Sequence, residues 1–296
     1  MSIERFDLSL PHGITLSCRA AGEEGLPRLV FLHGFPEAAF VWDELMLALA
    51  PRFRCIAPNL RGYERSSRPA EVEAYRAKHL MADVAAVIAA TGTGPLAALV
   101  AHDWGGAVAW NLAVQQPTLM QRLVIINSPH PGTFLRELQQ SEAQREASAY
   151  MNRLCELRAE QALAADDYAA LWPFFTEHGG RPWLTDELKA RYREVWDQGL
   201  TGPLNYYRAS PMRPPTASDP AAMALKFAPE FVTVKLPTTV IWGLDDRALP
   251  PAMLDGLEQF VPELDLHRVP GAGHWIVHEQ PALLAGLIEQ AVRAAR

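Results

Sequence analysis

Short, mostly apolar runs alternate along this chain with longer segments of helical periodicity, and this alternation constrains the fold more than any other feature. Runs of this kind are typical of strands whose two faces are both buried by crossover helices. The pattern therefore predicts an α/β fold built on a parallel sheet. The predicted parallel strands are Leu29 to Leu32, Arg54 to Ala57, Leu96 to Ala101, Leu123 to Ile126, Thr239 to Trp242 and Leu266 to Val269.

Two further runs near the N-terminus have the pattern of a β-hairpin. Phe6 to Leu10 and Ile14 to Arg19 flank a turn from Pro11 to Gly13, and Pro and Gly are residues that turns favour. We expect this hairpin to begin the sheet at an antiparallel edge. Together with the six apolar runs, it predicts an eight-stranded, mostly parallel sheet with helices on both faces.

The alternation is interrupted by a long helical segment. It stops after Ile126 and resumes only near Val234, and the residues between are rich in Tyr, Trp, Glu and Ala at helical spacing. The exit from Pro211 to Pro220 is rich in Pro, Ser and Thr, which is typical of an irregular connection. We therefore expect a core domain made of residues 1–131 and 228–296, with a helical cap domain of residues 132–227 inserted into it.

Composition and charge exclude several classes of function. The chain has 296 residues, a formal net charge of -7 and no basic block, so neither nucleic acid nor an anionic membrane surface is an expected partner. The sequence has neither a secretory leader nor the roughly 18 consecutive apolar residues of a membrane span. We expect a cytoplasmic protein that is a monomer or a homodimer.

The cysteines do not indicate a metal or redox centre. Cys18, Cys55 and Cys155 are widely spaced, and no C-x-x-C pair occurs. We expect the three cysteines to be buried thiols that pack as small apolar residues. With no glycine loop for phosphates and no cluster of metal ligands, the sequence predicts a protein that needs no cofactor.

The run from Ala101 to Gly105 has the pattern of a nucleophile elbow. It follows a predicted strand and opens a helix, and small residues flank its centre at two positions. Such residues let the chain turn tightly enough to expose the central side chain at the end of the strand. The usual serine is replaced here by Asp103. The pattern predicts a carboxylate nucleophile, and a helix-capping aspartate is the alternative.

Two later loops supply an acid and a histidine in the chain order that this motif requires. Asp245 and Asp246 follow a predicted strand, and either can serve as the acid. Gly271 to Trp275 is a glycine-rich loop that brings His274 back over the edge of the sheet. No other histidine lies in a matching loop, so His274 is the expected base.

The run His33-Gly34-Phe35-Pro36 follows the strand that ends at Leu32. In this position the backbone amides of Phe35 and Trp104 are expected to form an oxyanion hole, which typically contributes a few kcal/mol per donor. Five residues at this edge of the sheet are expected to contact the substrate: Phe35, Pro36, Trp104, His130 and Trp275.

An aspartate nucleophile changes the reaction. A carboxylate that displaces a leaving group at saturated carbon becomes an alkyl ester of itself. His274 would then remove a proton from the water that attacks the carbonyl carbon of this ester. An epoxide oxygen and a halide both suit such a nucleophile. The alkoxide from an epoxide needs a weak acid such as a tyrosine hydroxyl, whereas a halide needs N–H donors and no proton.

The sequence resembles the epoxide hydrolases of the α/β-hydrolase superfamily over nearly its whole length. The matching runs are His33 to Glu37, Asn59 to Tyr63, His102 to Gly106, Pro203 to Arg208, Trp242 to Asp246 and Gly273 to Trp275. The resemblance implies that Asp103 is the nucleophile and His274 the base. The G-x-x-D spacing, with Pro250 downstream, favours Asp246 over Asp245, and Asn127 cannot supply the acid that some relatives carry there.

In the family that the sequence resembles, two cap tyrosines hold the epoxide oxygen. One maps onto Tyr207, because the run Asn205-Tyr206-Tyr207-Arg208 is similar to the family's N-W-Y-R segment. The other maps onto Tyr150, where the local match is thin. The expected substrate is a small apolar epoxide, which reacts with water to give a vicinal diol.

Two alternatives remain. Haloalkane dehalogenases are similar through the same D-W-G run and would use Trp104 as a halide donor. Haloacetate dehalogenases fit less well, because they carry Arg where this chain has Trp104 and Ala107, so an anionic substrate is disfavoured. The second alternative is a non-catalytic member of the fold that binds a ligand or partner, since fold alone does not prove function.

Overall fold

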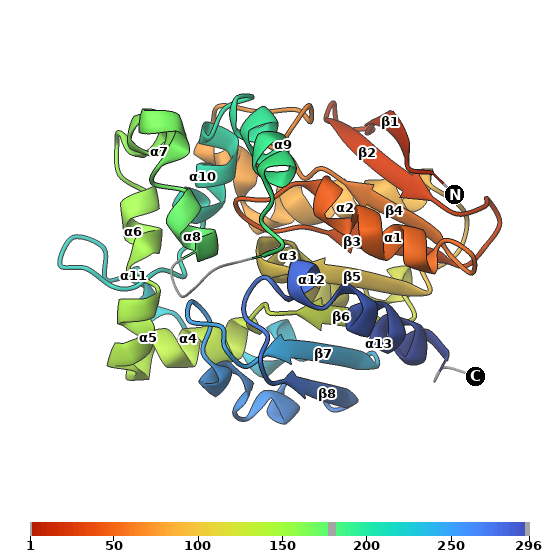
Figure 1. Cartoon of the computed structure of the whole chain (residues 1–296). Coiled ribbons are helices and arrows are strands. Elements are labelled where there is room, and N and C mark those ends of the chain that lie inside the picture. The colour runs from red at the N-terminus through yellow and green to blue at the C-terminus, as the bar shows by residue number, and fades with distance from the viewer. Residues whose placement is uncertain (1, 177–181, 294–296) are drawn as a thin grey trace.

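The computed structural model describes residues 2–176 and 182–293. An eight-stranded sheet runs through the molecule in the order β1-β2-β4-β3-β5-β6-β7-β8 (Figure 1). The strands are β1 (Glu4–Ser9), β2 (Thr15–Ala21), β3 (Arg28–Leu32), β4 (Arg54–Pro58), β5 (Ala98–His102), β6 (Leu123–Ile126), β7 (Thr238–Gly243) and β8 (Leu264–Val269).

The strand directions confirm the predicted topology. β1 pairs antiparallel with β2, and β2 pairs antiparallel with β4. Every pairing from β4 through β3, β5, β6 and β7 to β8 is parallel. The N-terminal hairpin therefore forms the antiparallel edge of a mostly parallel sheet, as its turn residues predict.

Burial of the central strands explains their apolar sequences. Every residue of β3, β5, β6 and β7 is buried, whereas β8 at the edge is partly exposed. One strand boundary differs from the prediction. Leu96 makes only an isolated bridge to Met120, so β5 begins at Ala98 and extends to His102, which pairs with Ile126. The nucleophile candidate follows immediately.

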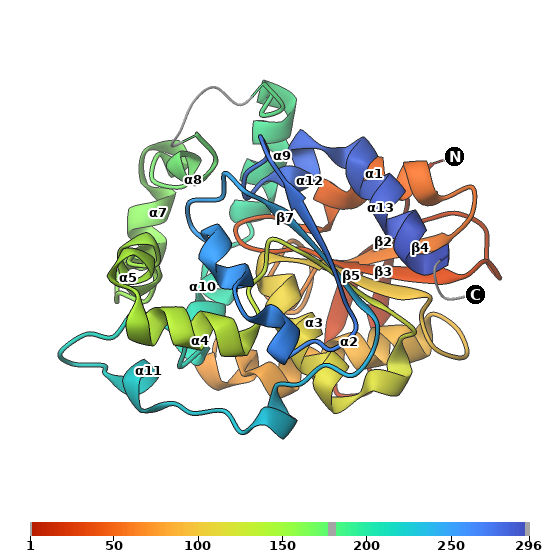
Figure 2. The same ribbon diagram turned by 90° about the horizontal axis from the view of Figure 1, so that it is seen from below.

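Helices cover both faces of the sheet. α1, α12 and α13 lie on one face, and α2 and α3 lie on the other (Figure 2). These core helices are α1 (Asp43–Leu49), α2 (Ala77–Ala90), α3 (Asp103–Gln115), α12 (Ile276–Glu279) and α13 (Pro281–Arg293). Short 3-10 helices occur at η1 (Ala39–Trp42), η2 (Val72–Tyr75), η3 (Pro117–Leu119), η4 (Pro229–Phe231), η5 (Pro251–Leu254) and η6 (Leu257–Gln259).

The segment between β6 and β7 is helical, as its periodicity indicates. Its helices are α4 (Pro131–Gln140), α5 (Glu142–Ala147), α6 (Tyr150–Leu154), α7 (Ala159–Tyr168), α8 (Trp172–Thr176), α9 (Asp186–Trp196), α10 (Thr201–Ala209) and α11 (Ala221–Ala224). We call α5 to α10 the cap helices; most of them gather at the left of Figure 1. That residues 132–227 form a separate domain stays a prediction. No helix in the described ranges is long and apolar enough to cross a membrane.

The parallel strands bring four loops to one edge of the sheet. β3, β5, β6 and β7 are consecutive neighbours, and their carboxyl ends lie at residues 32, 102, 126 and 243. Segments that are far apart in the sequence therefore meet where these strands end. Ligands of open α/β sheets bind in the same position, outside the carboxyl ends of the strands.

Close backbone approach explains the glycines of the elbow. A Cβ atom on Gly105 would lie 2.4 Å from the carbonyl oxygen of Leu32, and one on Gly106 would lie 2.3 Å from the Cβ of Ser128. Both distances are below van der Waals contact. Only glycine therefore lets α3 begin this close to β3 and to the loop after β6.

We predict that Gly105→Ala lowers the free energy of unfolding by about 1–3 kcal/mol, because the added methyl group meets backbone that cannot move aside. Gly286→Ala is the matched control, since nothing lies within 4 Å of its added Cβ in α13. This second change should stabilise the chain by about 0.5–1 kcal/mol. Urea denaturation measures both, and an unchanged midpoint for Gly105→Ala would contradict the close approach.

Candidate active site

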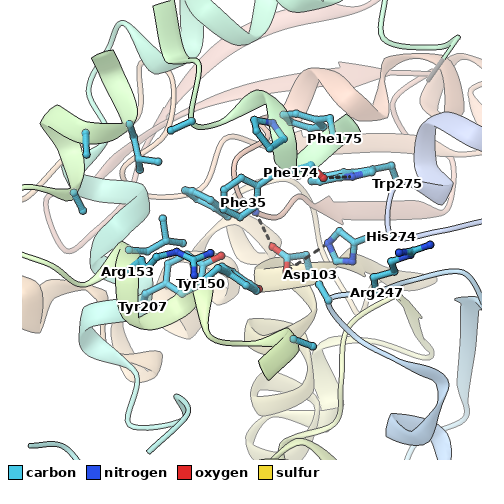
Figure 3. A pocket seen from close by; sticks show the side chains of 18 of the residues that line it. Phe35, Asp103, Tyr150, Arg153, Phe174, Phe175, Tyr207, Arg247, His274 and Trp275 are labelled. Atoms are coloured by element: carbon cyan, nitrogen blue, oxygen red, sulfur yellow. Dashed lines mark hydrogen bonds and ion pairs between the residues drawn. The ribbon is translucent and has the colours of Figure 1, made fainter. Parts of the chain in front are cut away.

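Asp103 stands at the sharp turn between β5 and α3. It is the first residue of α3, and its φ is +50°, in the left-handed region that a non-glycine residue rarely adopts. The Ser128 hydroxyl donates a hydrogen bond to the Asp103 carbonyl at 2.6 Å. This strained turn lifts the carboxylate above the sheet edge into a cavity (Figure 3).

The acid and the histidine converge on this carboxylate. His274 Nδ1 donates a hydrogen bond of 2.7 Å to Asp246 Oδ2, and His274 Nε2 lies 3.8 Å from Asp103 Oδ2. Asp246 is buried, whereas Asp245 is exposed and makes no such contact with His274. Among the described residues, the geometry thus pairs His274 with the acid that the G-x-x-D spacing favours.

Neighbouring donors fix the Asp246 carboxylate. Its Oδ1 accepts from the backbone amides of Ala248 and Leu249 at 3.0 and 2.9 Å, and Asn127 Nδ2 donates to its Oδ2 at 2.8 Å. Four hydrogen bonds, counting that of His274, satisfy a carboxylate that is withdrawn from water. Asn127 therefore holds the acid in place from the neighbouring strand end.

The surrounding charges favour the protonated form of His274. Burial opposes the charge on the imidazole, but the carboxylate of Asp246, through charge and hydrogen bond, and then that of Asp103 raise the pKa of His274 to about 9. The free site at neutral pH therefore holds an imidazolium beside the Asp103 carboxylate. Loss of either negative charge lowers this pKa.

A backbone amide already binds Asp103. The Phe35 N–H donates a hydrogen bond of 2.7 Å to Asp103 Oδ1. A Cβ on Gly34 would lie 2.3 Å from the Asp103 carboxylate, so glycine is required beside this donor. The Trp104 amide belongs to the first turn of α3, where N–H groups have no partner within the helix. These are the two amides that the sequence predicts for an oxyanion hole.

Two tyrosines from the cap helices lie opposite Asp103. Tyr150 begins α6, Tyr207 lies in α10, and their ring centroids are 6.1 Å apart in an edge-to-face arrangement (Figure 3). Burial, and then the charge of Asp103, raises the pKa of the Tyr150 hydroxyl. Burial, with the nearby Tyr150 and Asp103, raises that of Tyr207 as well. Both hydroxyls therefore stay protonated and can donate hydrogen bonds toward the carboxylate.

The cavity has a volume of about 730 Å³ and combines this polar centre with apolar walls. Seven of the predicted site residues line it: Phe35, Asp103, Tyr150, Tyr207, Asp246, His274 and Trp275. The side chains of Pro36 and Trp104 are not among the lining residues. The Trp104 ring packs edge-to-face on Tyr206 and Tyr207, with ring centroids 5.7 and 5.0 Å apart, and so supports the Tyr207 ring.

His130, which the sequence predicts to contact the substrate, is not among the residues that line the cavity. His130 caps the N-terminus of α4, where its Nδ1 accepts from the Gly132 amide and its Nε2 donates to the Val232 carbonyl at 2.7 Å. Its ring stacks on Phe260 with centroids 4.7 Å apart. The chain turns away from the cavity after β6, and the histidine is used to hold that turn.

Sequence reasoning missed a buried carboxylate below the site. Glu37 is fully buried, and its Oε1 accepts from the Tyr192 hydroxyl and from His278 Nε2, each at 2.8 Å. Although burial opposes its charge, hydrogen bonds with His102 and His278 lower the pKa of Glu37. Its negative charge also helps to raise the pKa of His274. The feature of the sequence that could have indicated this carboxylate is its position, directly after His33-Gly34-Phe35-Pro36.

The possible metal ligands in the described part of the chain do not cluster. The His, Cys, Asp and Glu side chains there form no group of three or more that could hold a metal ion.

We predict that Asp246→Asn lowers the pKa of His274 from about 9 by on the order of 1–3 units, because the imidazolium loses its nearest negative charge. Asp245→Asn is the matched control and should leave this pKa within a few tenths of a unit. Titration of the ring nitrogen resonances by NMR measures both. A larger shift in Asp245→Asn would assign the acid to the other aspartate.

Comparisons with known proteins agree with this architecture. The family model of the alpha/beta hydrolase fold matches residues 27–281. The chain is 36% identical over 282 residues to the AB hydrolase superfamily protein YfhM of Bacillus subtilis (strain 168), with 94% of each protein covered. It is 31% identical over 287 residues to epoxide hydrolase 4 of Mus musculus, with 93% of this chain and 76% of that protein covered.

Solved structures give the same result. The Bacillus megaterium epoxide hydrolase in complex with an inhibitor has a TM-score of 0.89 and 29% identity, over 97% of this chain and 100% of that one. A structure described as one of the novel epoxide hydrolases from metagenomes of hot environments has a TM-score of 0.86 and 37% identity, over 99% of both chains. The chain therefore belongs to the α/β-hydrolase fold family and, within it, to the epoxide hydrolases.

Proposed function

We propose that this protein hydrolyses an epoxide to a vicinal diol through a covalent ester on Asp103. The observation that carries the proposal is the pair of tyrosine hydroxyls, Tyr150 and Tyr207, that share the cavity with Asp103 and His274. An opening epoxide needs a nucleophile at carbon and an acid at oxygen. This cavity holds both kinds of group on opposite walls.

The first step forms the ester. Asp103 Oδ1 is held by the Phe35 amide, so Oδ2 is the oxygen that is free to attack an epoxide carbon. The new C–O bond forms as the ring C–O bond breaks, and the epoxide oxygen leaves as an alkoxide that is still attached to the product. Tyr150 and Tyr207 donate hydrogen bonds to this oxygen, which takes a proton from one of them because an alkoxide is more basic than a phenolate.

Ester formation changes the charge beside His274. Esterified Asp103 has lost its negative charge, which is one of the causes that raise the pKa of His274 toward 9. The pKa of the imidazole therefore falls in the alkyl-enzyme. The imidazolium can then pass its proton to the tyrosinate left by the first step, which restores the tyrosine and leaves His274 as a neutral base near neutral pH. The first step thus prepares the base for the second.

The second step hydrolyses the ester. Water gives a proton to His274 Nε2, and its oxygen attacks Cγ of Asp103. Negative charge develops on Oδ1, where the Phe35 amide, and with it the Trp104 amide, stabilises it. Collapse breaks the bond between Cγ and the ester oxygen, and the second proton of the water passes to the leaving alkoxide. The diol is released, and the water oxygen stays in the carboxylate. The proton taken from water leaves His274 as the imidazolium of the free site.

The arrangement favours an epoxide over a haloalkane. A departing halide needs N–H donors, yet the Trp104 side chain is not among the cavity-lining residues and packs instead against the ring of Tyr207. Two hydroxyls near Asp103 have no task in halide release. The arrangement also favours an enzyme over a protein that only binds a ligand, because ligand binding alone does not require the strained backbone of Asp103 or its position beside His274.

We predict that Tyr207→Phe slows alkylation of Asp103 by on the order of 10²-fold, because the epoxide oxygen then lacks one of its two proton donors. Hydrolysis of an ester that has already formed should change little, since this hydroxyl faces the departing oxygen. Tyr150→Phe should act in the same direction. Rapid-mixing measurements with styrene-type epoxides separate the two steps.

Tyr206→Phe is the matched control. Its hydroxyl donates to the Arg61 carbonyl at 2.9 Å, away from Asp103, so its removal should affect stability more than alkylation. Haloalkanes are assayed beside the epoxides. If Tyr207→Phe alkylates at the parent rate while Trp104→Phe loses turnover of bromoalkanes, the protein is a dehalogenase.

A further inference from the structure

We propose that Trp196, in cap helix α9, is a positioning residue for the oxyanion hole: its indole holds the loop whose Phe35 amide stabilises the oxyanion during ester hydrolysis. The inference rests on the proposed function and adds a residue of the cap helices to its second step. Trp196 does not line the cavity, and its indole N–H donates a hydrogen bond of 2.7 Å to the Pro36 carbonyl. Because Pro36 directly follows Phe35, this contact reaches the loop that carries the oxyanion donor.

Residues 34–37 form a hydrogen-bonded turn after the end of β3. The Glu37 N–H donates to the Gly34 carbonyl at 3.1 Å. That carbonyl and the Phe35 N–H belong to one peptide unit, which is planar, so a rotation that moves one of them moves the other. The direction of the Phe35 N–H toward Asp103 therefore depends on how the far end of the turn, at Pro36 and Glu37, is held.

Helix α9 holds that far end through two side chains. The Trp196 indole binds the Pro36 carbonyl, and the Tyr192 hydroxyl donates to Glu37 Oε1 at 2.8 Å. The two aromatic residues are four apart in the helix, so they lie on one face, and their rings stack with centroids 5.5 Å apart. All four residues are buried, so a hydrogen bond lost here leaves a polar group without water to replace its partner.

The sequence of α9 explains why this helix packs against the core. Its apolar residues recur at helical spacing and form one face: Leu188, Tyr192, Val195 and Trp196. Arg191, next to this face, makes an ion pair of 2.8 Å with Asp43, the first residue of α1. Figure 1 shows α9 on the side of the cap helices that faces the core. The helix therefore joins the cap helices to the oxyanion loop.

The Phe35 amide matters more for the second step than for the first. When Asp103 is alkylated it loses its negative charge, and an amide that stabilises the starting carboxylate does not speed this loss. During ester hydrolysis negative charge develops on Oδ1, where the amide acts. A displaced amide should therefore slow hydrolysis and change alkylation little. General loosening of the cap helices should slow alkylation as well, because Tyr150 and Tyr207 belong to them.

Trp172 supplies a matched control within the same aromatic cluster. Its ring packs on that of Trp196 with centroids 4.7 Å apart, and neither residue lines the cavity. The Trp172 N–H donates to the Asp167 carbonyl at 3.1 Å, which is a contact within the cap helices. Replacing either tryptophan with Phe keeps an aromatic ring and removes one hydrogen bond. The two changes differ in whether the lost bond reaches the core.

The first measurement separates the two steps by rapid mixing with a styrene-type epoxide. Trp196→Phe should slow ester hydrolysis by about 10-fold, which is part of the effect of losing an oxyanion donor altogether. Alkylation should change little, so a larger fraction of the enzyme should carry the ester during turnover, and intact-protein mass spectrometry measures this fraction. Trp172→Phe should hydrolyse the ester at the parent rate.

The second measurement observes the Phe35 amide itself and needs no substrate. Gly34-Phe35 is the only Gly-Phe pair in the sequence, so heavy carbon in the glycine carbonyls and heavy nitrogen in the phenylalanines give one NMR cross-peak for this amide. Its short hydrogen bond to Asp103 should place the amide proton downfield. Trp196→Phe should move this proton upfield, and Trp172→Phe should leave it unmoved.

An unmoved Phe35 resonance in Trp196→Phe overturns the inference. An equal slowing of both steps in this variant also overturns it, and so does an equal shift of the resonance in Trp172→Phe, because both results indicate general loosening of the cap helices.

Tyr192→Phe keeps the test decisive if Trp196→Phe does not fold. It retains the ring and removes only the hydroxyl that binds Glu37. This change should move the same resonance and slow the same step by a smaller amount, and no effect on either overturns the inference. If the parent chain forms no adduct with any epoxide tested, the proposed function has failed, and the Phe35 resonance alone then decides whether α9 holds the loop.

Discussion

The left-handed backbone of Asp103 is the constraint on which the rest of the site depends. A non-glycine residue at φ +50° costs on the order of 1–3 kcal/mol and persists only where its surroundings hold it. Here β5 ends directly before it, Ser128 binds its carbonyl, and Gly34 and Gly105 let β3 approach closely. The turn presents Oδ1 to the Phe35 amide and Oδ2 to His274. The two carboxylate oxygens can therefore have different roles, Oδ1 in the oxyanion hole and Oδ2 in the attack on the epoxide.

Charge coupling follows from this placement. Asp103 and Asp246 flank His274, and together they hold its pKa near 9 even though burial opposes the charge. In the proposed reaction the nucleophile loses its charge when it forms the ester, and the histidine becomes a base at that moment. Asn127 and two backbone amides keep Asp246 oriented throughout, because each of its oxygens has hydrogen-bond donors.

The sequence predicted those parts of the structure that rest on local pattern. Runs such as Leu123 to Ile126 specify buried strands, and the elbow around Asp103 follows from small residues at a strand end. Features that depend on packing between distant segments could not be predicted from the sequence. His130 was expected in the cavity but caps α4, and Glu37 meets partners from α9 and α12. Tyr150 had a thin local match, and its position beside Tyr207 is set by how α6 and α10 pack.

Covalent attack by Asp103 is the central claim, and the fate of water oxygen in a single turnover tests it most directly. Enzyme in excess is mixed with an epoxide in water labelled with heavy oxygen, and the diol and the peptide that contains Asp103 are analysed by mass spectrometry. Attack by Asp103 predicts a first-turnover diol without label and one labelled oxygen in the Asp103 carboxylate. Label in the first-turnover diol, with none in that peptide, would show that water attacks the epoxide directly and would contradict the account.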